Sequence, residues 1–183
     1  MNFIDTYKVD VNLCDKLIKY WKNNKEYKHE GSFGSEQVDK TIKNSTDVIF
    51  FNSSKDTYIK EFFKKLSTCV TQYCSKYKID TLINTSLANK IQYYPKGGGY
   101  KVYHYERDHL KNSSRQLVYM LYLNTIKDKG GTKFLNQKIT TPAIKGNLII
   151  WPAEFTHIHK GIVSPSEEKY IATRQTKKRI HLK

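Results

Sequence analysis

Two histidines and a glutamate in the second half of the chain have the residue types and the order of a metal site. His104 and Glu106 are two residues apart, and His159 follows much later in the chain. Side chains at i and i+2 of a strand point to one face, so His104 and Glu106 would aim together from a strand over 100–106. Two imidazoles and one carboxylate can occupy one face of an octahedral Fe(II) and leave the other face open, as in non-heme oxygenases. The spacing therefore predicts iron-dependent oxygen chemistry, provided that the three residues converge.

Neighbouring residues leave two alternatives open. His157 would project to the same face as His159 from an extended segment, and Asp108 would join Glu106 if the strand continued. A His-x-Glu pair by itself is more often a solvated or ion-paired couple than a metal site, so the prediction rests on all three residues together.

The first half of the chain has helical periodicity. Apolar residues at three- and four-residue steps predict one helix over about 12–24, with Asn12 as its cap, and a second over about 54–77. The polar segment 25–47 has the composition of a loop, and the short apolar run 48–51 is either a strand or a packing segment.

After residue 88 the apolar period changes from 3.6 to 2. Strands are expected at 91–94, 100–106, 116–123, 132–135, 138–141, 147–151 and 169–173. Helices followed by many short strands predict an α+β domain whose sheets close into a barrel or jelly roll. We expect a single domain over 1–183, with a helical part over about 1–87, a barrel over about 88–175 and a basic tail over 176–183.

The chain is strongly basic, with 32 Lys and Arg against 17 Asp and Glu and a formal net charge of +15. Such a field attracts anions and polyanions, although most lysines are scattered and the tail is expected to be a solvated segment. No apolar run approaches the ~20 residues of a membrane span, and no signal peptide is expected. Three cysteines without metal-ligand spacing favour a reduced, intracellular (cytoplasmic) protein.

The second half also carries many short motifs in a familiar order. Besides His104, Glu106 and His159 they are 92–95 before a glycine-rich turn, 117–124, 130–134, Pro142 with Lys145 and Gly146, 149–153, and Lys169. In these motifs, over roughly 88–175, the chain resembles the Fe(II)/2-oxoglutarate-dependent dioxygenases, specifically the prolyl 4-hydroxylase-like group with many microbial and phage members. The resemblance implies a double-stranded β-helix (a cupin-like jelly-roll barrel), with the N-terminal helices on its outer sheet and the metal at the barrel mouth.

The resemblance also implies a cosubstrate pocket. In this family the late histidine lies ten residues before a lysine that binds the distal carboxylate of 2-oxoglutarate. That register selects His159 over His157 and assigns the cation to Lys169, with Tyr94 and Tyr122 as further pocket residues. Arg174 is the alternative cation, although its odd step from Lys169 turns it to the opposite face of a regular strand.

The reaction implied by the resemblance uses Fe(II), 2-oxoglutarate and dioxygen, with ascorbate as a stimulant. The expected substrate is a protein or peptide side chain, prolyl among the candidates, and the basic charge keeps a nucleic-acid base as an alternative. The chain departs from the family at Glu106, where aspartate is usual, because glutamate adds a methylene that shifts the ligand oxygen unless something compensates. A metal-binding module without catalysis is therefore a third interpretation, and the oligomeric state is not readable.

Overall fold

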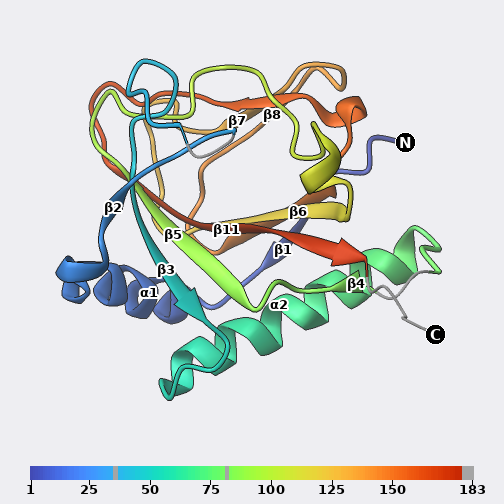
Figure 1. Cartoon of the computed structure of the whole chain (residues 1–183), viewed down its shortest axis with the longest axis horizontal. Coiled ribbons are helices and arrows are strands. Elements are labelled where there is room, and N and C mark those ends of the chain that lie inside the picture. Colours follow the sequence, from blue (N-terminus) through green and yellow to red (C-terminus); the bar gives the residue numbers. More distant parts are fainter. Residues whose placement is uncertain (35–36, 81–82, 179–183) are drawn as a thin grey trace.

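The computed structural model describes residues 1–34, 37–80 and 83–178 and contains two antiparallel sheets and two α-helices within these ranges (Figure 1). The elements are β1 (Asp5–Lys8), α1 (Val11–Asn23), β2 (His29–Glu30), β3 (Thr46–Phe51), α2 (Thr57–Lys76), β4 (Ile83–Asn84), β5 (Ala88–Tyr94), β6 (Arg115–Tyr122), β7 (Thr132–Phe134), β8 (Ile139–Thr141), β9 (Asn147–Pro152), β10 (His159–Gly161) and β11 (Lys169–Lys178). Short 3-10 turns lie at Lys25–Tyr27, Leu110–Asn112 and Phe155–His157.

The larger sheet has the strand order β1-β9-β6-β11-β5-β3-β2, with β4 also paired to β11, and the smaller sheet has the order β10-β7-β8. Successive side chains of β6 alternate between two apolar cores. Tyr119 lies in the core shared with the helices, whereas Val118 and Met120 lie in the core between the sheets, where Phe134 comes from the smaller sheet. This two-sheet arrangement confirms the expected α+β class and jelly-roll-like fold.

Both helices cover the outer face of the larger sheet, as Figure 1 shows. Phe50 of β3 anchors them, because its ring packs edge-on against Tyr20 of α1 and Phe62 of α2 at centroid distances of 6.1 and 5.4 Å. The expected cap Asn12 is wrong by two residues. The side chain of Asp10 accepts from the backbone N–H of Asn12 at 2.9 Å, which is the usual geometry between a cap and the second helical residue.

The N-terminal part is less purely helical than expected. Strand β1 pairs with β9 at one edge of the larger sheet, and β3 pairs with β5 towards the other. A four-residue edge strand such as β1 is too short to reveal its period, so the sequence pattern did not predict it.

The expected strand over 100–106 is wrong. This segment forms only isolated bridges, Tyr100 with Lys43 and His104 with His159. At the end of this segment the backbone pairs with a loop instead of a strand: the N–H groups of Glu106 and Arg107 both donate to the carbonyl of Ala153.

The barrel also extends beyond the expected end at residue 175. Strand β11 continues to Lys178, and the buried hydroxyl of Thr176 accepts from the backbone N–H of Leu117 at 3.1 Å. The rest of the predicted basic tail, 179–183, lies outside the described residues. Of the helices that the structure describes, neither combines the length and apolar character needed to cross a membrane.

Candidate metal centre and cofactor pocket

The backbone places His104 and His159 opposite each other. They form an antiparallel bridge in which each amide donates to the other's carbonyl, at 3.0 and 2.9 Å. Their imidazole centroids are 4.4 Å apart. One ligand atom from each histidine and one from Glu106 lie within 4.8 Å of one another, so the structure brings together the three residues that the sequence pattern singled out.

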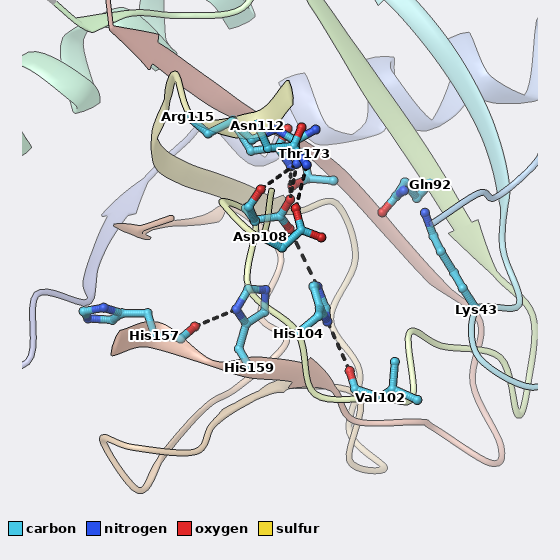
Figure 2. A network of polar contacts seen from close by, with 12 residues as sticks. Lys43, Gln92, Val102, His104, Asp108, Asn112, Arg115, His157, His159 and Thr173 are labelled. Atoms are coloured by element: carbon cyan, nitrogen blue, oxygen red, sulfur yellow. Dashed lines mark hydrogen bonds and ion pairs between the residues drawn. The ribbon is translucent and has the colours of Figure 1, made fainter. Parts of the chain in front are cut away.

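Both imidazoles direct their Nε2 atom towards the candidate metal position. His104 Nδ1 lies 3.1 Å from the carbonyl of Val102, and His159 Nδ1 lies 2.9 Å from the carbonyl of His157 (Figure 2). A carbonyl only accepts, so each Nδ1 carries a proton, and in its neutral form each ring keeps its lone pair on Nε2. A backbone partner on the far nitrogen fixes the ring orientation, as is usual for metal-binding histidines.

Burial keeps His159 neutral. Its ring packs between Phe134 and Trp151, at centroid distances of 5.7 and 5.0 Å. This burial and the neighbouring His104 lower the pKa of His159 to about 4, so the imidazole is available as a ligand at neutral pH.

Glu106 is held as an ionised carboxylate. Burial acts to raise its pKa, but the neighbouring His104, His159 and Arg115 together lower the pKa to about 2. Its Oε1 lies 3.6 Å from His104 Nε2, and its Oε2 accepts from Arg115 at 3.3 Å and from Gln175.

Neither alternative ligand joins the group. The Nε2 of His157 donates to the carbonyl of Asn2 at 2.8 Å, and in Figure 2 its ring points away from His104. Asp108 turns towards the ring of His109 and the side-chain amide of Asn112, each at 2.7 Å.

Lys169 lies in the same cavity as the three residues, a cavity of about 330 Å³. Lys169 is only 5% exposed, and its ammonium donates to the carbonyls of Gly130 and Ile162 at 2.9 and 3.2 Å. Gly130 has a φ of +77°, a conformation that favours glycine and here belongs to the turn whose carbonyl meets Lys169. Burial lowers the pKa of Lys169 to about 8, because carbonyl dipoles only partly compensate a charge removed from water.

The other predicted pocket residues differ in what they offer. Tyr94 lines the cavity, but its hydroxyl donates to Gln92 at 3.0 Å and its ring centroid lies 5.1 Å from the Lys169 ammonium. Tyr122 does not line the cavity. Its hydroxyl shares a 2.8 Å hydrogen bond with the hydroxyl of Thr132, and Thr132 does line the cavity. Arg174 borders the cavity, but its charge acts on the hydroxyl of Tyr119, in the core of the opposite face.

Sequence reasoning missed a buried polar network on the β3–β5 wall of the cavity. Asp47 is fully buried, lies 3.6 Å from the ammonium groups of both Lys43 and Lys90, and accepts from Gln92 at 2.9 Å. Gln92 in turn accepts from Tyr94, which also lines the cavity. A carboxylate inside an otherwise apolar strand was the available signal, since such a group must be paired when buried. Arg115 and Gln175, the partners of Glu106, were missed as well.

No protein-family model and no curated protein matches this chain. Solved structures do match. A prolyl-4-hydroxylase of Pseudomonas putida has a TM-score of 0.77 at 14% identity, over 98% of this chain and 94% of the other. A prolyl hydroxylase of Trichoplax adhaerens, in complex with a hypoxia inducible factor peptide fragment, has a TM-score of 0.79 at 11% identity, over 97% and 84%. The viral collagen prolyl hydroxylase of Paramecium Bursaria Chlorella virus-1, as a 2OG complex, has a TM-score of 0.74 at 20% identity, over 98% and 97%.

These likenesses cover nearly the whole of this chain and most of each neighbour, and at such low identity they establish the fold. The two-sheet architecture and the resemblance seen in the sequence motifs agree with them. The chain therefore has the fold of these prolyl hydroxylases.

Proposed function

We propose that this protein is an Fe(II)- and 2-oxoglutarate-dependent dioxygenase that hydroxylates a protein or peptide side chain. One observation carries the proposal. A His104–Glu106–His159 cluster with ligand atoms within 4.8 Å of one another shares a cavity with buried Lys169, whose ammonium has no carboxylate partner among the described residues. Two neutral imidazoles and one carboxylate suit Fe(II) and leave coordination positions free for other ligands.

The chemistry of the donors fits the cosubstrate. An ammonium has three N–H donors, and Lys169 uses two of them on backbone carbonyls. No carboxylate of the described residues pairs with it, so the distal carboxylate of a dicarboxylic acid would supply the missing charge. Fe(II) and 2-oxoglutarate, when bound, supply the oxidising chemistry, in which decarboxylation of the keto acid is coupled to hydroxylation.

The protein's own residues bind and orient the metal and the cosubstrate, and they exclude water from the site. His104 and His159 hold their Nε2 lone pairs ready through their backbone partners. Phe134 and Trp151 pack an apolar wall on His159, and Tyr100 stacks on His104 at a centroid distance of 3.8 Å. These contacts keep the ligand geometry fixed and dry, which is the contribution a protein makes to metal-centred reactions.

A peptide is the substrate class that the neighbours favour, because one of them is in complex with a peptide fragment and all three are prolyl hydroxylases. Proline-containing peptides are therefore the first to test. Hydroxylation would add one oxygen atom to the peptide, which mass spectrometry detects.

Anaerobic titration with Fe(II) and 2-oxoglutarate tests the proposal. Chelation of the keto acid by Fe(II) gives a charge-transfer band in the visible range. We expect the wild type and His157→Ala to give the band and His159→Ala to lose it, with thermal melts confirming that all three proteins are folded. A band in His159→Ala but not in His157→Ala would overturn the ligand assignment.

Succinate release in air separates an enzyme from a metal-binding module. We expect the wild type to release succinate when Fe(II), 2-oxoglutarate, ascorbate and a peptide substrate are present. A protein that gives the charge-transfer band but releases no succinate with any peptide of a proline-containing library would be a metal-binding module.

A further inference from the structure

Arg115 contacts Glu106 at two points, once on the backbone and once on the carboxylate. Arg115 donates to the backbone carbonyl of Glu106 at 2.8 Å and to its Oε2 at 3.3 Å. Gln175 donates to the same Oε2. The other oxygen, Oε1, is the one that faces His104 Nε2 at 3.6 Å. The two carboxylate oxygens therefore have separate partners: Oε2 accepts from Arg115 and Gln175, and Oε1 faces His104.

An irregularity in the sheet delivers these two donors. Gln175 pairs with Val118, but Lys177 pairs with Arg115, so β6 has one extra residue across this stretch. In a regular strand Arg115 and Val118, three residues apart, would face opposite sides. The bulge brings Arg115 to the cavity side, and the hydroxyl of Thr176 satisfies the amide of Leu117 within it. Bulges near active sites commonly re-aim a side chain in this way.

The same arrangement compensates for the greater length and flexibility of glutamate relative to aspartate. A longer side chain has one more rotatable bond and can offer either oxygen, or both, to a metal. Two donors on Oε2, one of them an arginine that also grips the backbone of the same residue, leave Oε1 as the free oxygen. Hydrogen bonds from an ionised donor to a carboxylate are among the stronger ones in proteins.

We propose that Arg115 and Gln175 are positioning residues that hold Glu106 as a one-oxygen metal ligand. This inference rests on the proposed function, since it assumes the metal site. It assigns to Gln175 a role in this chain that follows from the glutamate: an aspartate at the same position, one methylene shorter, would withdraw its carboxylate from both donors.

Co(II) titration of the purified protein, followed by its visible spectrum, tests the proposal without turnover. Gln175→Leu should weaken Co(II) binding by about 10–100-fold, the usual effect of removing a partner of a metal ligand. Glu106→Asp should also weaken it. In the Glu106→Asp background the further change Gln175→Leu should cost less than about three-fold, because the contact is already lost and the two effects are coupled. The apo proteins should differ little in thermal stability.

Gln137→Leu is the matched control, because the same substitution there removes an amide that donates to the carbonyl of Thr156 instead of to Glu106. It should bind Co(II) like the wild type. Co(II) affinity of Gln175→Leu within about three-fold of the wild type, or an equal loss in both backgrounds, would overturn the inference. The metal site itself would still stand if the wild type binds Co(II) and His159→Ala does not; a wild type that binds no Co(II) removes both proposals.

Discussion

At the scale of the residue, Lys169 is a buried cation without a counter-charge among the described residues. Its ammonium is buried with two carbonyl acceptors and no carboxylate partner among the described residues, which lowers its pKa to about 8 from an ordinary 10.5. A charge kept in this state destabilises the empty protein. We expect it to bind an anion, because the cost of desolvating the cation is already met in the folded state.

Replacing Lys169 by methionine should separate stability from binding. Between pH 8 and 10.5 the unfolded chain binds a proton that the folded protein releases, so the group's contribution to folding stability improves as pH rises through this range. At pH 7 Lys169→Met should therefore be more stable than the wild type, by at most on the order of 3 kcal/mol, and the difference should shrink towards pH 10.5. Urea denaturation at pH 7 and pH 10 measures it, and a less stable variant at pH 7 would contradict the prediction.

The same titration affects cosubstrate affinity. Binding a dicarboxylate favours the charged form of Lys169, so the affinity for 2-oxoglutarate should fall as pH rises above about 8 and Lys169→Met should bind at least tenfold more weakly at pH 7. Calorimetric titration in the presence of Fe(II), without oxygen, gives both values. Equal affinity at pH 7 and pH 9.5 would show that this ammonium does not contact the ligand.

At the scale of the element, strand β3 has two adjacent phenylalanines with opposite environments. Phe50 is fully buried between the two helices, whereas Phe51 is 52% exposed. Strand geometry turns consecutive side chains to opposite faces, so this pair isolates what packing of the helices contributes.

Phe50→Ala should lower the free energy of unfolding by about 3–5 kcal/mol, because it leaves a cavity between α1, α2 and the sheet. Phe51→Ala, the same substitution one residue on, should cost less than about 1 kcal/mol, as is common for exposed positions. Chemical denaturation of the two variants gives the comparison, and similar losses would refute the predicted orientation of β3.

Strand β3 also carries Asp47, which joins it to the cavity wall. Asp47→Asn removes the carboxylate that Lys43 and Lys90 share, and leaves the buried ammonium of Lys43 and the partly buried ammonium of Lys90 without this counter-charge. We expect a loss of about 3–5 kcal/mol in unfolding free energy, as for other broken buried ion pairs. Asp15→Asn is the control: it breaks an ion pair with Lys145 in which Asp15 is 62% exposed, and should cost less than about 1 kcal/mol.

At the scale of the whole molecule, the formal net charge of +15 sets a repulsive background. Self-repulsion of like charges destabilises a compact state, and salt screens it over a distance of about 10 Å at 0.1 M. This background is separate from the cavity, where Lys169 and the Asp47 network depend on burial.

Sodium chloride should therefore stabilise the protein. Raising it from about 10 to 200 mM should increase the unfolding free energy by on the order of 1 kcal/mol, which corresponds to a rise in Tm of about 2–4 °C for a chain of this size. The same concentration of glycine, a zwitterion that adds no ionic strength, should have little effect. A Tm that falls with salt would mean that attractive ion pairs outweigh the repulsion.

The sequence predicted the helices and strands that have a clear local pattern of apolar residues. It did not predict which elements pack or pair with each other. The apolar stripe of α2 and the continuous apolar run of β6 appear in the chain itself, and both elements are found where they were expected. His104 and Glu106 were expected to converge because of a strand over 100–106. They converge although this strand is absent, through the bridge to His159 and the hydrogen bonds to Ala153.

Long-range choices explain the remaining differences. Nothing in the local pattern shows that Asp5–Lys8 would pair with β9, that Gln175 would reach Glu106, or that the hydroxyl of Tyr94 would bond to Gln92. Each depends on which distant residue lies alongside in the folded chain, and periodicity carries no information about that. Motif resemblance recovered the fold because its matches are spread over many strands at once.

The two backbone hydrogen bonds between His104 and His159 fix the positions of the two residues relative to each other. Neither histidine can move without breaking these hydrogen bonds, and the fold positions both of them without a bound ion. An incoming cation would thus meet a receptor whose entropy was already reduced when the chain folded, so capture should proceed with little rearrangement of the surrounding backbone.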